Sequence, residues 1–279
     1  MTERRVQVVT GGTSGMGKAT AIALGKFGPV IIGGRNEKRL TEALEEVKAA
    51  GVEAYGHKCD VSDLDSLTAF AAAAQEIAPI GNVVHAAGID SNGGDSAKIL
   101  AVNMGGTINV DNVFLPLMDH AALVNFTSVT GYFYQPGPED LAIWNEATSP
   151  AVCEPYLAYL EKRDLIPGME FLGRAYLAYA ASKSFCIYHT KANATRYAKR
   201  GCQIFSIAPG TFMTPMLRKT MGDNAEAAGA RTPMGRVGTP EEMADLIQKL
   251  LEPGHEYLTG CDIVMDGGMV AGQMAKQLA

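Results

Sequence analysis

Short apolar runs alternate with longer amphipathic stretches along most of this chain. The apolar runs are mostly aliphatic and continuous, and they occupy residues 5–9, 30–32, 83–86, 122–126, 203–208 and 262–265. Such runs are typical of strands that are covered on both faces. The stretches 18–27 and 37–50 between them have helical periodicity. This alternation predicts an α/β fold in which right-handed crossovers build one doubly wound parallel sheet, Rossmann-like, with helices on both faces.

A proline-rich segment interrupts the alternation at residues 132–173. It carries five prolines and the only tryptophan, Trp144, and residues 156–164 within it have the pattern of a short helix. A connection this long is rare in a compact domain unless it has a role. We therefore interpret the chain as a single domain over residues 1–279, with a helical insertion at 132–173.

Composition and charge exclude several classes of protein. The chain has 279 residues, 47% of them hydrophobic and 19% charged, which is typical of a globular domain and not of a disordered chain. Its net charge of −6, without a basic run, argues against nucleic acid as a partner. No apolar run approaches the ~18 residues of a membrane span, and the N-terminus has no signal-peptide pattern. The five cysteines lack C-x-x-C spacing, so we expect reduced thiols in a cytoplasmic protein.

A glycine-rich turn lies between the first predicted strand and the first predicted helix. It reads Thr10-Gly11-Gly12-Thr13-Ser14-Gly15-Met16-Gly17, a T-G-x-x-x-G-x-G spacing that is one residue wider than the common G-x-G-x-x-G. Glycines let the backbone approach a pyrophosphate closely, and a helix N-terminus offers free N–H groups. We therefore predict that residues from this turn bind a dinucleotide, namely Gly11, Thr13, Ser14, Gly15, Met16 and Gly17.

The end of the second predicted strand indicates which dinucleotide is preferred. An acidic residue there would hold the ribose hydroxyls of NAD and repel a 2′-phosphate. This chain instead has Arg35 and Asn36 after two glycines. Because a guanidinium pairs well with phosphate, NADP(H) is favoured, and NAD(H) stays an alternative if Arg35 is only a solvated turn residue.

Tyr179 and Lys183 form the candidate catalytic pair. They are four residues apart in a helical stretch, so their side chains share one face. A phenol ordinarily titrates near pH ~10, and we expect the neighbouring ammonium to lower that pKa. Such a pair exchanges a proton with an alcohol or carbonyl oxygen. A Y-x-x-x-K spacing is common by chance, but together with the glycine turn it favours a functional interpretation.

Further motifs follow the same order along the chain. They are Cys59-Asp60-Val61, His85-Ala86-Ala87-Gly88, Val102-Asn103-Met104, Thr127-Ser128-Val129-Thr130-Gly131, Pro209-Gly210-Thr211 through Thr214-Pro215, and Asp266-Gly267-Gly268. With them, the chain resembles the short-chain dehydrogenase/reductase family from Val6 to about Gly268. Ala86 is a departure, because the N-N-A-G element of the family has its second asparagine there.

The resemblance implies a metal-free oxidoreductase whose catalytic residues are Asn103, Ser128, Tyr179 and Lys183. In the family, the tyrosine exchanges the proton, the serine polarises the substrate oxygen, and the lysine also binds the nicotinamide ribose. The asparagine holds a water linked to that lysine. Hydride then passes directly between carbon atoms. The resemblance adds cofactor contacts from Asp60, Val61, Ala87, Gly88, Tyr179, Lys183, Pro209, Gly210, Thr211 and Thr214.

The insertion narrows the resemblance to one branch of the family. Ser128 and Tyr179 are 51 positions apart, where the family usually has a short connection before the active-site helix. This departure resembles the branch that contains bacterial 3α-hydroxysteroid dehydrogenase/carbonyl reductase. The resemblance implies a hydroxysteroid or another bulky apolar carbonyl as the small-molecule substrate. It also implies a homo-oligomer, a homodimer or a homotetramer.

Methionines and aromatics near these motifs fit an apolar substrate pocket, since methionine suits an adaptable apolar wall. The candidates are Thr130, Tyr132, Trp144, Tyr176, Met213 and Met216. The alternative is that these side chains only pack the insertion onto the domain.

Two other functions share much of this pattern. A 3-oxoacyl-thioester reductase would carry the same motifs, but it would prefer a basic patch for an acyl carrier, and the sequence has no dense basic cluster near the active-site loops. A non-catalytic, dinucleotide-sensing interaction protein would not need the intact set of four catalytic residues.

Overall fold

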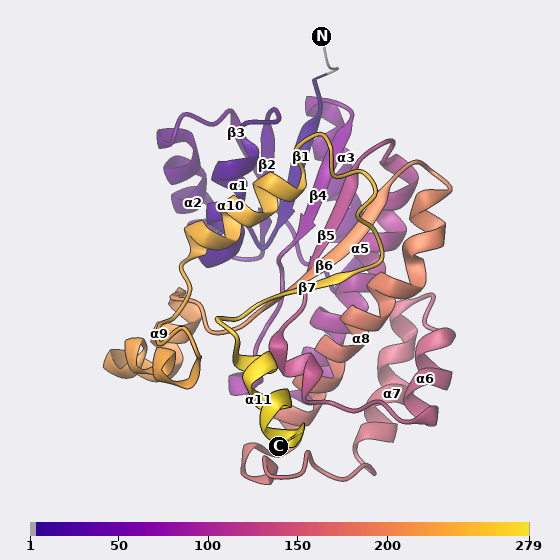
Figure 1. The fold of residues 1–279 in the computed structure, drawn as a ribbon. Coiled ribbons are helices and arrows are strands. Elements are labelled where there is room, and N and C mark those ends of the chain that lie inside the picture. Colours follow the sequence, from indigo (N-terminus) through magenta and orange to yellow (C-terminus); the bar gives the residue numbers. More distant parts are fainter. Residues whose placement is uncertain (1–3, 279) are drawn as a thin grey trace.

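Parallel strands in the order β3-β2-β1-β4-β5-β6-β7 form one sheet in the computed structural model, which describes residues 4–278 (Figure 1). Their bounds are β1 Val6–Thr10, β2 Val30–Gly34, β3 Ala54–Lys58, β4 Ile80–His85, β5 Ala122–Phe126, β6 Gln203–Pro209 and β7 Asp262–Met265. The order reverses between β1 and β4, which confirms the doubly wound topology. In open α/β sheets ligands bind outside the carboxyl edge at this reversal.

Six of the strands were expected from apolar runs, and β3 was not. Its sequence, AYGHK, is largely polar and mostly exposed, because β3 is the edge strand and pairs only with β2. An edge strand needs fewer apolar side chains than a strand covered on both faces.

Two layers of helices cover the sheet. On one face lie α1 (Gly15–Leu24), α2 (Glu37–Ala49) and α10 (Pro240–Leu250), and on the other α3 (Leu64–Ile77), α5 (Gly106–Phe114) and α8 (Gly173–Ala198) (Figure 1). The shorter helices are α4 (Ser96–Leu100), α6 (Pro138–Asn145), α7 (Cys153–Leu160), α9 (Pro215–Met221) and α11 (Met269–Leu278). Each main layer buries its own cluster of apolar side chains against the sheet. No helix within residues 4–278 combines the length and the hydropathy needed to cross a bilayer.

The segment 132–173 folds as two short helices, α6 and α7, beside α8 (Figure 1). The expected helix at 156–164 begins earlier, at Cys153, and ends at Leu160. The carboxylate of Asp140 is fully buried at the centre of the segment. It accepts hydrogen bonds from Tyr134, from Tyr156 at 2.7 Å, and from Tyr159 at 3.1 Å, and it pairs with Arg163. Charge and hydroxyl groups thus add to the apolar packing of Tyr134 and Tyr156 in this segment.

Trp144 packs this segment onto the domain and does not line a substrate wall, so that expectation is corrected. Its side chain is only 3% exposed and is enclosed by the rings of Tyr134, Tyr156, Phe185 and Tyr188. Burying so large an aromatic side chain against α8 stabilises the segment more than exposing it to a ligand would.

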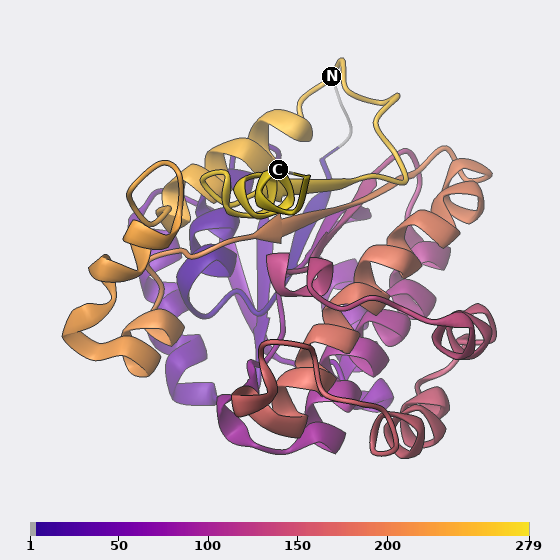
Figure 2. The same ribbon diagram turned by 60° about the horizontal axis from the view of Figure 1, so that its bottom comes forward.

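Viewed along the carboxyl edge of the sheet, α9 and the segment 132–173 lie on opposite sides of that edge (Figures 1 and 2). Both α9 and the segment 132–173 thus lie next to the edge where an open parallel sheet binds ligands.

Candidate active site

The glycine turn forms a cradle that only glycine can form. Gly11 has a φ of +69°, and a Cβ built on it would lie 2.6 Å from the amide nitrogen of Ala87. A Cβ on Gly17 would lie 2.4 Å from the carbonyl oxygen of Gly11. Any side chain at either position would therefore fill the space between the turn and β4. The side chain of Ser14 makes no hydrogen bond to cap α1, so the N–H groups of the first turn are available to an anion.

The loop after β6 lies against this turn. A Cβ on Gly15 would contact the Cγ2 of Thr214 at 3.2 Å, and Thr214 caps α9 through its hydroxyl, which accepts from the Leu217 N–H. At the start of the loop, the Gly210 N–H donates to the Met265 carbonyl at 2.9 Å. The residues from Pro209 to Thr214 thus lie at the same edge of the sheet as the glycine turn.

Arg35 and Asp60 lie together at the far end of this cradle. Gly34 is in contact with Thr13 of the turn, since a Cβ on Gly34 would meet the Cγ2 of Thr13 at 2.3 Å. Arg35 follows and is 46% exposed, with its Nη1 3.9 Å from the carboxylate of Asp60. At that distance the ion pair is weak, so a phosphate could compete for the guanidinium. Asn36 serves as the N-cap of α2, accepting from the Arg39 N–H.

Gly88 lies close to two of the candidate catalytic side chains. A Cβ there would lie 3.3 Å from the Oδ1 of Asn103 and 3.4 Å from the Nζ of Lys183. Ala87 just before it donates its N–H to the Thr10 hydroxyl at 3.4 Å. Val61 packs against Gly106, near the start of α5. The predicted cofactor residues from different motifs thus line one continuous edge.

Asn103 occupies a single π-helical turn, Ala101–Gly105, and its side chain is fully engaged. Its amide both donates to and accepts from the backbone of Ile89 at 3.0 Å. It also donates to the Ser182 hydroxyl at 3.2 Å, and that hydroxyl donates to the Tyr179 carbonyl at 2.8 Å. Ser182 therefore connects Asn103 to the active helix, a role that sequence reasoning missed. Its place between Tyr179 and Lys183 was the available signal.

The electrostatics of Tyr179 differ from the sequence expectation. Desolvation by the surrounding protein raises the pKa of Tyr179 to about 12, and the nearby Ser128 hydroxyl opposes that rise. We expected Lys183 to lower this pKa, but the lysine Nζ donates instead to the Phe126 carbonyl at 2.9 Å. Burial lowers the pKa of Lys183 itself. Desolvation therefore dominates the shift, and the pKa of the phenol lies well above neutral pH.

Ser128 is oriented for hydrogen-bond donation. Its Oγ accepts from the Thr130 N–H at 3.2 Å, which leaves the hydroxyl hydrogen free to point toward Tyr179 or a substrate oxygen. Tyr176 lies beside both Thr130 and Tyr179. A hydrogen bond with Thr130 opposes the rise in the pKa of Tyr176, and Tyr176 in turn raises the pKa of Tyr179. The predicted neighbours Thr130 and Tyr176 are thus brought to the catalytic residues.

The other predicted substrate residues lie in different surroundings. The hydroxyl of Tyr132 is directed toward β7, where it donates to Asp262 at 2.6 Å. Met216 on α9 is 48% exposed, and Met213 precedes it in the loop at the edge of the sheet.

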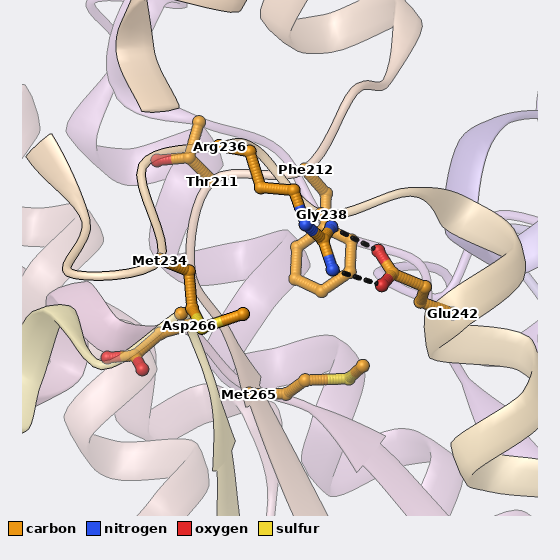
Figure 3. Close-up of a pocket in the computed structure, with 9 residues that line it drawn as sticks. Thr211, Phe212, Met234, Arg236, Gly238, Glu242, Met265 and Asp266 are labelled. Carbon is orange, nitrogen blue, oxygen red and sulfur yellow. Dashed lines mark hydrogen bonds and ion pairs between the residues drawn. The ribbon is translucent and has the colours of Figure 1, made fainter. Parts of the chain in front are cut away.

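A small cavity of about 80 Å³ lies behind the loop after β6 (Figure 3). Arg236 and Glu242 form a two-pronged ion pair across it, at 2.9 and 2.6 Å. Of the predicted cofactor residues it includes Thr211 alone, and it includes none of the four predicted catalytic residues. The candidate active site is therefore the carboxyl edge around Gly88 and not this cavity.

No group of three or more potential metal ligands occurs among the described residues, and all five cysteines are free of disulfides.

Two family models match separate parts of this chain. A model described as "short chain dehydrogenase" matches residues 5–138, and one described as "Enoyl-(Acyl carrier protein) reductase" matches residues 167–270. The unmatched residues between them fall inside the segment 132–173. "Short-chain dehydrogenase/reductase bsc3" from Alternaria brassicicola is 30% identical, over 93% of this chain and 94% of its own.

Two more similar proteins bear on activity. "3-oxoacyl-[acyl-carrier-protein] reductase FabG" from Thermotoga maritima is 28% identical, over 96% of this chain and 98% of its own. A solved structure of a tryptophan variant of actinorhodin polyketide ketoreductase with NADPH has a TM-score of 0.74 and 26% identity, over 96% of this chain and 97% of its own. The chain belongs to the short-chain dehydrogenase/reductase family. It is thus an oxidoreductase that acts on CH–OH groups, in a family that binds NAD(P).

Proposed function

We propose that this protein reduces a bulky apolar ketone to the secondary alcohol with NADPH, and that it belongs with the hydroxysteroid dehydrogenase/carbonyl reductase branch. The observation that carries the proposal is the place of Tyr179 on α8 beside Ser128, where burial raises the pKa of its phenol. A phenol with a pKa of about 12 holds its proton at neutral pH and can give it to a carbonyl oxygen.

The residues present fit a dinucleotide. The cradle at Gly11 and Gly17 and the uncapped first turn of α1 would hold its pyrophosphate, and Arg35 would pair with a 2′-phosphate. The Nζ of Lys183 lies close to Gly88, where it would hold the ribose. When bound, the nicotinamide supplies the hydride.

The protein's own contribution to the reduction is orientation and proton transfer. Tyr179 donates the proton as the carbonyl oxygen gains electrons, and Ser128 donates a hydrogen bond that strengthens as that oxygen becomes negative. Asn103, Ser182 and the backbone of Tyr179 form one chain of hydrogen bonds, which connects α8 to the π-helical turn Ala101–Gly105.

The substrate class rests on the exposed apolar side chains near the carboxyl edge of the sheet. Large apolar side chains are exposed on both sides of the carboxyl edge, on α9 and its loop at Met216 and Met234, and before α8 at Phe171 and Leu172. The solved structure of a ketoreductase with NADPH supports the same general chemistry.

Reduction of a 3-oxoacyl thioester is the second candidate. The FabG relative favours it, and so does the presence of two exposed basic side chains, Arg218 and Lys219, on α9. A carrier-bound substrate would need such cations beside the entrance.

A substrate panel separates the two candidates. Steady-state NADPH oxidation is followed with polycyclic ketones, small polar ketones and acetoacetyl thioesters, and each ketone is also run with NADH. We expect kcat/KM for polycyclic ketones to exceed that for thioesters by about tenfold or more, because apolar burial adds to binding. NADPH should be preferred, and Arg35→Asp should narrow that preference. Turnover confined to thioesters, or to small polar ketones, would contradict the proposal.

A further inference from the structure

Asp262 is an unusual residue for its position. It is the first residue of β7 and the only carboxylate in the strands of residues 4–278, and three apolar residues follow it. It pairs in register with Ser206 of β6, which pairs in turn with Asn125 of β5. Asp262 therefore lies at the end of a polar row that crosses β7, β6 and β5. A charge in this location requires partners.

Three hydroxyls from different parts of the chain donate to this carboxylate. Thr127 donates to Oδ1 at 2.9 Å, Tyr132 donates to Oδ2 at 2.6 Å, and Ser206 also donates to Oδ1. Hydrogen bonds to a charged acceptor are stronger than those between neutral groups. Asp262 thus connects β6 and β7 to a segment that follows β5.

Two of these donors, Thr127 and Tyr132, lie on either side of the candidate catalytic Ser128 in the sequence. Thr127 immediately precedes Ser128, and Tyr132 ends the 3₁₀ turn, Val129–Tyr132, whose N-cap is Ser128. One carboxylate therefore holds both ends of the segment 127–132. Thr127 is fixed further, since its N–H donates to the Ile207 carbonyl at 2.9 Å.

This segment has little room to move without disturbing the catalytic geometry. Gly131 runs so close to α8 that a Cβ on it would lie 2.8 Å from the carbonyl carbon of Lys183. A shift of the segment would change the separation of Ser128 from the Tyr179 phenol. Displacements of about 1 Å can cost on the order of a hundredfold in rate.

We propose that Asp262 is a positioning residue that sets the place of Ser128 by holding both ends of the segment 127–132. The proposal rests on the proposed function, in which Ser128 polarises the substrate oxygen. Asp262 itself touches neither substrate nor cofactor in this scheme.

The test compares two tyrosines that each donate to a carboxylate. Tyr132→Phe deletes the bond to Asp262, whereas Tyr197→Phe deletes a bond of 2.5 Å from Tyr197 to Asp111, which belongs to α5 and not to the segment. We expect Tyr132→Phe to lower kcat about fivefold and Asp262→Ala about tenfold or more, with Asp262→Asn between wild type and Asp262→Ala. The dissociation constant for NADPH should change less than about twofold, and Tyr197→Phe should keep the wild-type kcat.

A double-mutant cycle with Ser128→Ala tests whether Asp262 acts through the serine. In that background, Tyr132→Phe and Asp262→Asn should have no further effect on kcat, because the group they position is absent. An unchanged kcat in Tyr132→Phe and Asp262→Asn would overturn the proposal, as would equal losses with and without Ser128, or an equal loss in Tyr197→Phe. If Ser128→Ala itself keeps full activity, the role of Ser128 in the proposed function fails, and the positioning role fails with it.

Discussion

Tyr132 and Tyr134 are two residues apart, yet their hydroxyls donate to different buried or half-buried carboxylates. Tyr132 donates to Asp262 at the edge of the sheet, and Tyr134 donates to Asp140 inside the segment 132–173. Both carboxylates collect hydroxyl groups from separate elements. A carboxylate surrounded by hydroxyl groups therefore occurs twice near the start of the segment 132–173. One is Asp262 on the sheet, and the other is Asp140 within the segment.

The difference between the clusters lies in the counter-charge. Asp140 pairs with Arg163, whose guanidinium also lies over the ring of Tyr134, whereas the three described hydrogen-bond partners of Asp262 are all hydroxyls. A fully buried carboxylate with a cation and several donors is a fixed structural centre. A carboxylate that hydroxyls alone satisfy, two of them flanking Ser128, suits placement of a catalytic segment. We therefore expect the Asp140 cluster to stabilise the segment 132–173, and the Asp262 cluster to fix the position of Ser128.

The largest expected effect is on stability at the Asp140 cluster. Asp140→Ala leaves Arg163 and three phenols without their acceptor, so we expect it to lower the free energy of unfolding by about 3–5 kcal/mol. Asp262→Ala removes an acceptor from hydroxyls only and should cost about 1–3 kcal/mol. Urea denaturation followed by circular dichroism measures both. If Asp262→Ala proves the more destabilising change, the contrast between the two clusters is wrong.

A smaller effect is expected at alkaline pH. Burial raises the pKa of Tyr156 at the Asp140 cluster and the pKa of Tyr132 at the Asp262 cluster. Because the folded pKa exceeds the unfolded value of about 10, the stability from these phenols is present below pH ~10 and is lost as the pH rises above it. Tyr156→Phe should therefore make the alkaline decline shallower, by up to about 1.4 kcal/mol per pH unit.

Tyr132 is only half-buried, so Tyr132→Phe should change that decline less. Unfolding free energies measured from about pH 9 to 11 compare the variants. An equal or larger change in Tyr132→Phe would show that the Asp262 cluster is as enclosed as the Asp140 cluster.

Much of the fold could be predicted from the sequence because it depends on local patterns. The doubly wound sheet follows from continuous apolar runs, and the glycine turn at Gly11 and Gly17 follows from a spacing with a strict steric cause. The edge strand β3 escaped prediction because its polar residues face solvent. Trp144 was misplaced because an aromatic residue in a sequence gives no sign of whether protein or ligand will cover it.

The sequence indicated which residues form the candidate site, but it did not indicate their hydrogen bonds or pKa values. The spacing of Tyr179 and Lys183 gave their shared helix face, but not that the lysine would donate to Phe126, or that desolvation would dominate the pKa of the phenol. The contacts of Asp262 could not be predicted from the sequence either, because its partners Thr127 and Tyr132 are more than a hundred positions away along the chain.

The central claim is that a protonated Tyr179 delivers the proton in an NADPH-dependent ketone reduction, and Tyr179→Phe tests it most directly. In single-turnover mixing of the NADPH-loaded protein with a polycyclic ketone, the account predicts a loss of about a thousandfold in the hydride-transfer rate, with NADPH affinity unchanged. For the wild type it predicts a rate that stays level from about pH 6 to 9, because a phenol with a pKa of about 12 keeps its proton throughout. A Phe variant that transfers hydride at the wild-type rate would contradict the account.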